Sequence, residues 1–173
     1  FVAANRAALA ADVLIASDGP RVDPDCPTIA TGTRGTLHFD LAVRLRPGGV
    51  HSGHWGGLIP DPALVLSHAL AAVCDRQGRV LVEGWLPAGR RVPDAVRAAL
   101  DGCPVGAGAD IAPDPAWGEP GLSAAEKIYG WNGFIVLSML SGRPEAPVNA
   151  VAPDAVAHCQ IRYTADTDPE AFA

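Results

Sequence analysis

An alternation of apolar and polar side chains over residues 35–45 constrains the fold of this chain most strongly. In the segment GTLHFDLAVRL, every second residue is large and apolar: Leu37, Phe39, Leu41, Val43 and Leu45. Successive side chains of a β-strand point to opposite faces, so a period of two places these residues on one face. A strand with a single apolar face is typical of an antiparallel sheet that is covered on one side only.

A helix is predicted soon after this strand. Asp61 suits the N-cap position and Pro62 suits the first helical turn. The residues that follow form an apolar stripe at helical spacing, made of Leu66, Ala69, Leu70 and Val73. Further strands are predicted at residues 79–85, 131–140 and 156–165. This order of elements indicates an α+β fold, in which helices pack on one face of an antiparallel sheet.

The segment from residue 87 to residue 130 interrupts this pattern. It contains GCPVGAGADIAPDPAWGEPG, which is too rich in glycine and proline for regular structure. Pro93 and Asp94 can open a short helix that continues to Leu100. We expect an irregular insertion that carries one or two short helices.

Charge and composition exclude several classes of function. The net charge is −6 and the 13 Lys and Arg residues are scattered, whereas a nucleic-acid-binding protein needs a clustered basic surface. No apolar run approaches the roughly 18 residues that a membrane-spanning helix needs. The N-terminal residues lack the features of a signal peptide, so we expect a cytoplasmic protein. The four cysteines lie far apart, which indicates buried free thiols rather than a structural zinc site.

The segment GGVHSGHWGG, residues 48–57, is the densest cluster of glycines and histidines in the chain. Glycines this close together are used where the backbone bends sharply or approaches another group. A phosphate-binding loop is one candidate, but the segment lacks the GxGxxG order and a terminal Lys-Ser or Lys-Thr pair. Pro60 and Pro62 also remove backbone donors just ahead of the helix, which disfavours anion binding there.

Five short motifs together resemble the M20 family of metallopeptidases, on the dipeptidase and aminoacylase side of that family. They are SDGP (17–20), GTRG (32–35), VHSGHWGGLIPDP (50–62), VNAVAP (148–153) and QIRY (160–163), in that order. The resemblance implies a catalytic domain interrupted by a ferredoxin-like lid, or dimerisation, domain.

Applied to this chain, the resemblance divides it into two parts. Residues 1–25 would be the end of the catalytic domain, with a helix, a strand and a crossover linker. Residues 26–173 would be the lid, with an insertion at about 87–130.

The resemblance assigns roles to four residues. Asp18 would be a metal ligand, although an aspartate before Gly-Pro is also a common turn residue. His51 would reach into a partner's active site and stabilise an oxyanion, a role that suits an imidazole donor held in a tight turn. Arg162 would bind the substrate's terminal carboxylate through its guanidinium fork. Asn149 would hydrogen-bond the substrate backbone, although the proline that follows it is displaced by one position from the family pattern. His51 and Arg162 could equally be an ordinary turn histidine and an exposed strand arginine.

The family resemblance also implies an activity, which is hydrolysis of the amide bond in dipeptides or N-acyl amino acids by a homodimer with two zinc ions. The chain has no counterpart of the family's other zinc ligands, and a two-metal site needs several. We therefore expect the chain alone to be inactive and to bind no zinc tightly. The alternative is a non-catalytic dimerisation or protein-interaction module.

Overall fold

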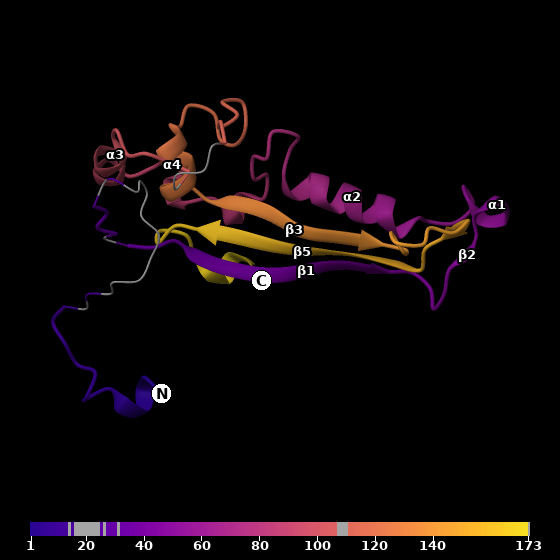
Figure 1. Cartoon of the computed structure of the whole chain (residues 1–173), viewed down its shortest axis with the longest axis horizontal. Helices are drawn as coiled ribbons and strands as arrows, with labels where there is room; N and C mark the ends of the chain where they lie inside the picture. Colours follow the sequence, from indigo (N-terminus) through magenta and orange to yellow (C-terminus); the bar gives the residue numbers. More distant parts are fainter. Residues whose placement is uncertain (14, 16–24, 26, 31, 107–110, 173) are drawn as a thin grey trace.

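The structure is a computed structural model that describes residues 1–13, 15, 25, 27–30, 32–106 and 111–172. Its centre is an antiparallel sheet of three long strands in the order β1-β5-β3 (Figure 1). These strands are β1 (Gly35–Arg44), β3 (Gly133–Ser141) and β5 (Asp154–Tyr163). The predicted strand at residues 35–45 is therefore confirmed, and so are the two later ones.

One face of this sheet is covered, as the alternation in β1 predicts. Helix α2 (Pro62–Val73) lies along that face (Figure 1) and contributes the fully buried Leu66 to the core. Asp61 caps the helix by accepting hydrogen bonds from the N–H groups of Ala63 and Leu64. Around Leu66 pack the small buried residues of β5 and the apolar residues of β1: Ala155, Ala157, Cys159, Phe39, Leu41 and Val43. The α+β fold is thus the observed one.

The opposite face of the sheet carries polar pairs between β1 and β5. Residues directly opposite each other in the register interact through their side chains. The pairs are Arg162 with Thr36 at 2.6 Å, Gln160 with His38 at 2.7 Å, and His158 with Asp40 at 2.6 Å. Side chains that oppose one another across an antiparallel pair lie on the same face, so these residues form one polar row.

A short two-stranded sheet lies beyond one end of the long strands (Figure 1). It pairs β2 (Val50–His51) with β4 (Ala150–Val151), and we call it the β2–β4 ribbon. The short helix α1 (Ser52–Trp55) follows β2 directly.

The insertion, residues 87–130, lies at the other end of the long strands (Figure 1). It contains two short α-helices, α3 (Asp94–Leu100) and α4 (Ala124–Tyr129), as predicted. Short 3-10 helices occur at η1 (Ala3–Asn5), η2 (Glu83–Trp85), η3 (Ala88–Arg90) and η4 (Pro169–Phe172). None of the helices in the described parts of the chain is long and apolar enough to cross a membrane.

The strand predicted at residues 79–85 is wrong. Val80 forms only an isolated bridge with Cys74, and Glu83–Trp85 is the 3-10 helix η2. The ring of Trp85 packs against Phe39 and Phe134, with ring centroids 5.8 and 6.3 Å away. Burial of this large aromatic ring on the covered face outweighs the strand preference of the apolar run.

Asn132 connects the start of β3 to the segments around it. Its side chain is buried and donates to the carbonyl of Trp85 and the hydroxyl of Thr167, each at 2.8 Å. It also accepts a hydrogen bond from the backbone N–H of Thr164 at 2.8 Å. A fully satisfied buried amide of this kind fixes the geometry of the chain just after Arg162.

Among the described cysteines, Cys159 is buried, Cys74 and Cys103 are half-buried, and all three are free thiols. Burial raises the pKa of the Cys159 thiol, which keeps it protonated and unreactive. The predicted free thiols are confirmed for these positions, and Cys26 lies outside the described residues.

Candidate functional site

His51 lies in the β2–β4 ribbon, where the chain turns into α1. Its Nδ1 accepts a hydrogen bond from the backbone N–H of Gly53 at 3.1 Å, so His51 serves as the N-cap of α1. In a neutral imidazole one ring nitrogen accepts and the other carries the proton, which places the proton on Nε2. The side chain is exposed, and the ring of His54 lies 4.7 Å away between centroids. His51 therefore presents an N–H donor at the tip of the molecule.

Gly53 is required in this arrangement because the ring of His51 lies directly over it. A Cβ at position 53 would lie 3.0 Å from Cε1 and 3.2 Å from Nδ1 of His51. Contacts this short are rarely tolerated, so a side chain here would push the imidazole out of position. The glycine in the HSG motif is explained by this close approach.

The β2–β4 ribbon brings Asn149 next to His51, although the two lie almost a hundred residues apart in the chain. His51 pairs with Ala150 in the register, and the backbone N–H of Ser52 donates to the carbonyl of Asn149 at 2.9 Å. Asn149 is exposed, so its side-chain amide is accessible. The structure thus brings together two of the predicted site residues.

Arg46 holds the ribbon in place, and the sequence analysis missed it. It is the second residue after β1, and its guanidinium donates to the backbone carbonyls of Pro60 and Ala152. One side chain therefore ties the segment after the His51 turn to the residue after β4. Its acceptors are backbone atoms of two distant segments, which leave no signal in the sequence.

Arg162 lies at the opposite end of the long sheet, next to the insertion. It is the second-last residue of β5, opposite Thr36 of β1 and Gly133 of β3. The ribbon lies beyond the other end of β5, and the strand rises about 3.3 Å per residue from Asp154 to Arg162. His51 and Arg162 of one chain are therefore separated by roughly 25 Å or more along the strand direction.

Tyr163 and Gly35 fix this end of the sheet. The two residues are opposite each other, and the ring of Tyr163 fills the space that a Cβ of Gly35 would occupy. The ring of Phe172 in η4 packs on Tyr163 with centroids 5.1 Å apart. The second glycine of the GTRG motif thus allows an aromatic ring to lie on β1.

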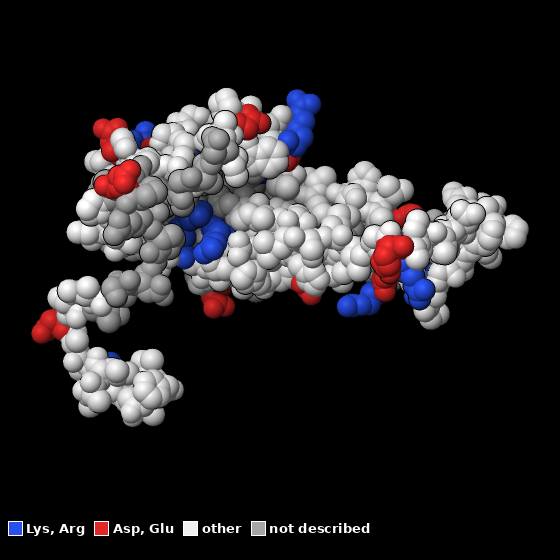
Figure 2. Space-filling model, viewed as in Figure 1, with Lys and Arg blue, Asp and Glu red and all other residues white. Residues whose placement is uncertain are grey.

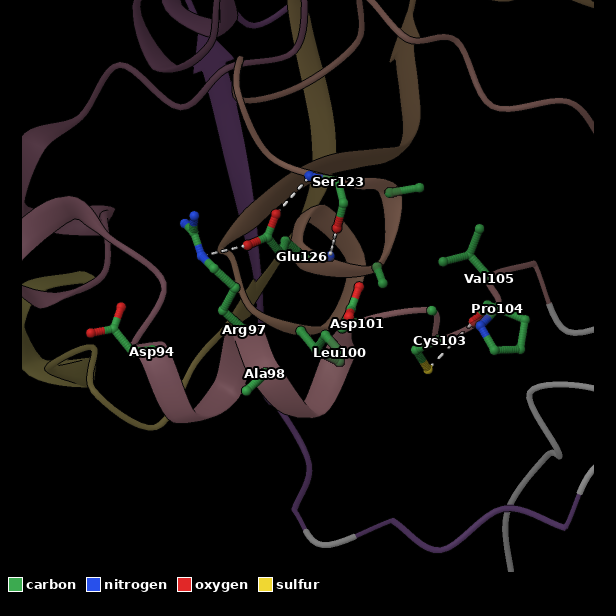
Figure 3. A pocket seen from close by; sticks show the side chains of 13 residues that line it. Asp94, Arg97, Ala98, Leu100, Asp101, Cys103, Pro104, Val105, Ser123 and Glu126 are labelled. Carbon is green, nitrogen blue, oxygen red and sulfur yellow. Dashed lines mark hydrogen bonds and ion pairs between the residues drawn. The ribbon is translucent and has the colours of Figure 1, made fainter.

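A hollow with a volume of about 780 Å³ lies in the insertion (Figure 3). Three of its polar residues, Arg97, Ser123 and Glu126, bind each other. Ser123 and Glu126 form a reciprocal capping box at the start of α4, and Arg97 pairs with Glu126 at 2.9 Å. The N–H of Ser123 and, secondarily, the Arg97 charge lower the pKa of Glu126. These contacts hold α3 against α4 and account for the charges of Arg97 and Glu126.

No group of three or more His, Cys, Asp and Glu residues in the described ranges could hold a metal ion. Asp18, the predicted metal ligand, lies outside these ranges, as do most of the strand and linker predicted for residues 1–25. The described residues therefore do not provide a metal centre.

Comparison with known proteins identifies relatives for nearly the whole chain. No protein-family profile matches the chain. It is 30% identical over 174 residues to a cysteinylglycine-S-conjugate dipeptidase from Corynebacterium striatum, covering 95% of this chain and 36% of that protein. An M20 family metallo-carboxypeptidase from Sulfolobus solfataricus superposes with a TM-score of 0.76 at 21% identity, covering 98% of this chain and 39% of that one.

The chain is thus similar in sequence to dipeptidases and shares its fold with an M20 family metallo-carboxypeptidase. A human Beta-Ala-His dipeptidase is 34% identical over 73 residues, which cover 42% of this chain and 14% of that protein. The relatives are peptidases, and the chain spans about a third of the length of the dipeptidase that it matches over 95% of its own length. The fold predicted from the family resemblance agrees with these comparisons.

Proposed function

We propose that this chain forms the lid and dimerisation part of a zinc-dependent M20-type hydrolase that cleaves the amide bond of dipeptides or N-acyl amino acids. The proposal rests on one observation, which is that His51 lies in the β2–β4 ribbon beyond one end of the long sheet, whereas Arg162 lies at the other end of that sheet. An extended dipeptide spans only about 7 Å. One chain therefore cannot place both residues on one substrate, whereas two copies related by a two-fold axis can.

In this proposal the two ends of the chain serve two different active sites. At one end, His51 donates its Nε2–H to the oxyanion that forms at the scissile carbonyl of the partner's site. Asn149, beside it in the β2–β4 ribbon, hydrogen-bonds the substrate backbone. At the other end, Arg162 binds the carboxylate of the substrate held in its own chain's site.

The metal chemistry belongs to the rest of the polypeptide. We propose that residues 1–25 end its catalytic domain and that Asp18 is one ligand of a site for two zinc ions. In this proposal the described residues contribute hydrogen-bond donors and dimer contacts, and Asp18 is the chain's ligand to the metal site. We expect the isolated chain to be inactive, without tightly bound zinc.

Apolar side chains on the edge strand β3 support the proposed homodimer. Leu137, Leu140 and Met139 are 54%, 48% and 43% exposed, and β3 has a partner strand on one side only. An exposed apolar edge strand is a surface that another chain can cover.

The test of the oxyanion role is kinetic and uses the full-length polypeptide. His51→Ala should lower kcat by about 100-fold, because loss of one oxyanion donor has an effect of that size. His54→Ala is the matched control, since it removes a neighbouring imidazole without removing the donor, and it should keep kcat near the wild-type value. An unchanged kcat in the His51→Ala enzyme would reject this role. A full-length protein that hydrolyses no dipeptide or N-acyl amino acid would favour the non-catalytic module.

A further inference from the structure

A second arginine, Arg34, lies beside Arg162 at the insertion end of the sheet. Arg34 immediately precedes β1, and Thr36, two residues later, is directly opposite Arg162. In an extended chain, residues two apart point to the same face, as do residues opposite each other. Arg34, Thr36 and Arg162 are therefore expected on the same face, the one that α2 leaves uncovered.

The guanidinium of Arg34 extends across the end of β5 toward β3. It donates from one Nη to the backbone carbonyl of Trp131 at 3.2 Å. Trp131 lies two residues before Gly133, which is the β3 residue opposite Arg162. Since β5 lies between β1 and β3, a side chain that starts beside β1 and ends at Trp131 must pass the end of β5, close to Arg162.

The two guanidinium groups retain most of their hydrogen-bond donors. Among the described contacts, Arg34 donates to the carbonyl of Trp131 and Arg162 donates to the hydroxyl of Thr36. A guanidinium has five N–H donors, so each group can still bind a carboxylate through its fork. The ion pairs of the described residues join Arg79 to Asp75, Arg90 to Glu83, Arg97 to Glu126 and His158 to Asp40, and none includes Arg34 or Arg162.

Two half-buried like charges without an acidic partner in the described structure are unfavourable unless an anion joins them. Burial lowers the pKa of Arg34, and the positive charge of Arg162 lowers it further. The second effect is expected when two guanidinium groups lie near each other. Figure 2 shows basic side chains set into a hollow where the sheet meets the insertion. Arg34 and Arg162 thus form a half-buried, positively charged pair that a small anion can join.

We propose that Arg34 and Arg162 together bind the terminal carboxylate of the substrate, with Arg34 as a second guanidinium that the carbonyl of Trp131 holds in place. This inference rests on the proposed function, because it adds a residue to the carboxylate site assigned there to Arg162. It also gives the insertion a function. Trp131, whose carbonyl accepts from Arg34, follows the insertion directly.

The proposal makes Arg34 a determinant of substrate specificity. A site with two cations favours substrates with a free carboxylate on the leaving amino acid over the corresponding amides. An amide cannot accept two charge-assisted hydrogen-bond pairs and leaves both cations without a counter-charge.

The test is an NMR titration of this chain with N-acetylglycine and, in parallel, with N-acetylglycinamide. The Nε–Hε signals of Arg34 and Arg162 are followed, and both should shift with the carboxylate and neither with the amide. Arg34→Gln should raise the apparent Kd for N-acetylglycine about tenfold or more, because the loss of hydrogen bonds to a charged group usually has an effect of that size. Arg34→Lys, which keeps the charge but loses the fork, should have an intermediate effect. Arg44→Gln, on an exposed arginine of β1, is the matched control and should leave the Kd unchanged.

Each outcome decides between the two proposals. A shift of the Arg162 signal alone, with an unchanged Kd in Arg34→Gln, overturns this inference and leaves the role of Arg162 intact. Absence of any shift at both signals rejects the carboxylate site altogether. Equal binding of the acid and the amide shows that charge is not what the site recognises and also overturns the inference. If Arg34→Gln fails to fold, the wild-type titration still tests the inference. A shift of the Arg34 signal with N-acetylglycine supports it, and an unshifted Arg34 signal overturns it.

Discussion

At the scale of single residues, the proposed oxyanion role depends on how the His51 ring is oriented. The exposed ring is held by one hydrogen bond, from the Gly53 N–H to Nδ1, and by the absence of a side chain at position 53. This contact fixes which ring nitrogen can donate, and an oxyanion donor must have its proton on the outward nitrogen.

Gly53→Ala therefore tests the orientation of His51 without removing the imidazole. The added Cβ would lie 3.0 Å from Cε1 of His51, so the ring must move. We expect kcat of the full-length enzyme to fall by about tenfold, a smaller loss than for removal of the donor. Gly48→Ala is the control, because a Cβ there would meet nothing within 4 Å. Equal kcat values for the two variants would contradict the orienting role of Gly53.

The sequence predicted His51, Asn149 and Arg162 only through the family resemblance. Their residue types fit their roles, but nothing local distinguishes them from a turn histidine, an exposed amide and a strand arginine. Arg34 and Arg46 were not predicted at all, because each uses the backbone carbonyl of a segment far away in the chain. Such contacts depend on the register of strands about a hundred residues apart, which composition and periodicity do not encode.

At the scale of elements, local signals predicted regular segments well and irregular ones poorly. The period of two in β1 and the Asp61-Pro62 start of α2 are strong because each has a direct structural cause in burial or capping. The failure at residues 79–85 has a tertiary cause, since Trp85 turns inward to pack on Phe39 and Phe134. The strands β2 and β4 have only two residues each, which is too short to show an alternation of apolar and polar side chains in the sequence.

The capping box of α4 predicts how the stability of the fold depends on pH. The folded structure lowers the pKa of Glu126 from its ordinary value of 4.5, so the ionised form stabilises the fold. This contribution is complete above about pH 4.5 and is lost as the pH falls through the lowered pKa of the folded state. Glu126→Gln should therefore reduce stability at pH 7 and weaken its decline in acid.

Urea unfolding of the wild type and Glu126→Gln at pH 7 and pH 3 measures this effect. The difference between their unfolding midpoints should be largest at pH 7 and should shrink at pH 3. Glu145→Gln removes an exposed carboxylate in the turn between β3 and β4 and serves as the control for the loss of a surface charge. A difference between wild type and Glu126→Gln that stays constant or grows toward pH 3 would show that the ionised carboxylate does not stabilise α4.

Asn132 gives a second prediction at this scale. Its truncation in Asn132→Ala leaves the N–H of Thr164 and the carbonyl of Trp85 without their partner in a buried region. We expect a loss of about 2–4 kcal/mol in the free energy of unfolding, because each buried unsatisfied group costs about 1–3 kcal/mol. Asn149→Ala, at an exposed position, should change it by less than about 0.5 kcal/mol. Similar values for the two variants would contradict the structural role of Asn132.

At the scale of the whole molecule, the long sheet separates the two ends to which we assign functions. The covered face, built on Leu66 and the small residues of β5, keeps β1 and β5 aligned over ten residues each. The β2–β4 ribbon carries His51 at one end, and Arg162 lies with Arg34 at the other. We therefore propose that a molecule built this way completes an active site only when a second copy is present.

The most direct test of this account mixes two full-length variants, His51→Ala and Arg162→Gln, each nearly inactive alone. In a mixed two-fold dimer, one site would have both substitutions and the other would have neither. Random exchange makes half of the dimers mixed, so we expect about a quarter of the wild-type activity to return. If His51 and Arg162 instead served the same chain's site, every site would keep one defect. The mixture would then be no more active than the variants measured separately, and the proposed arrangement would be wrong.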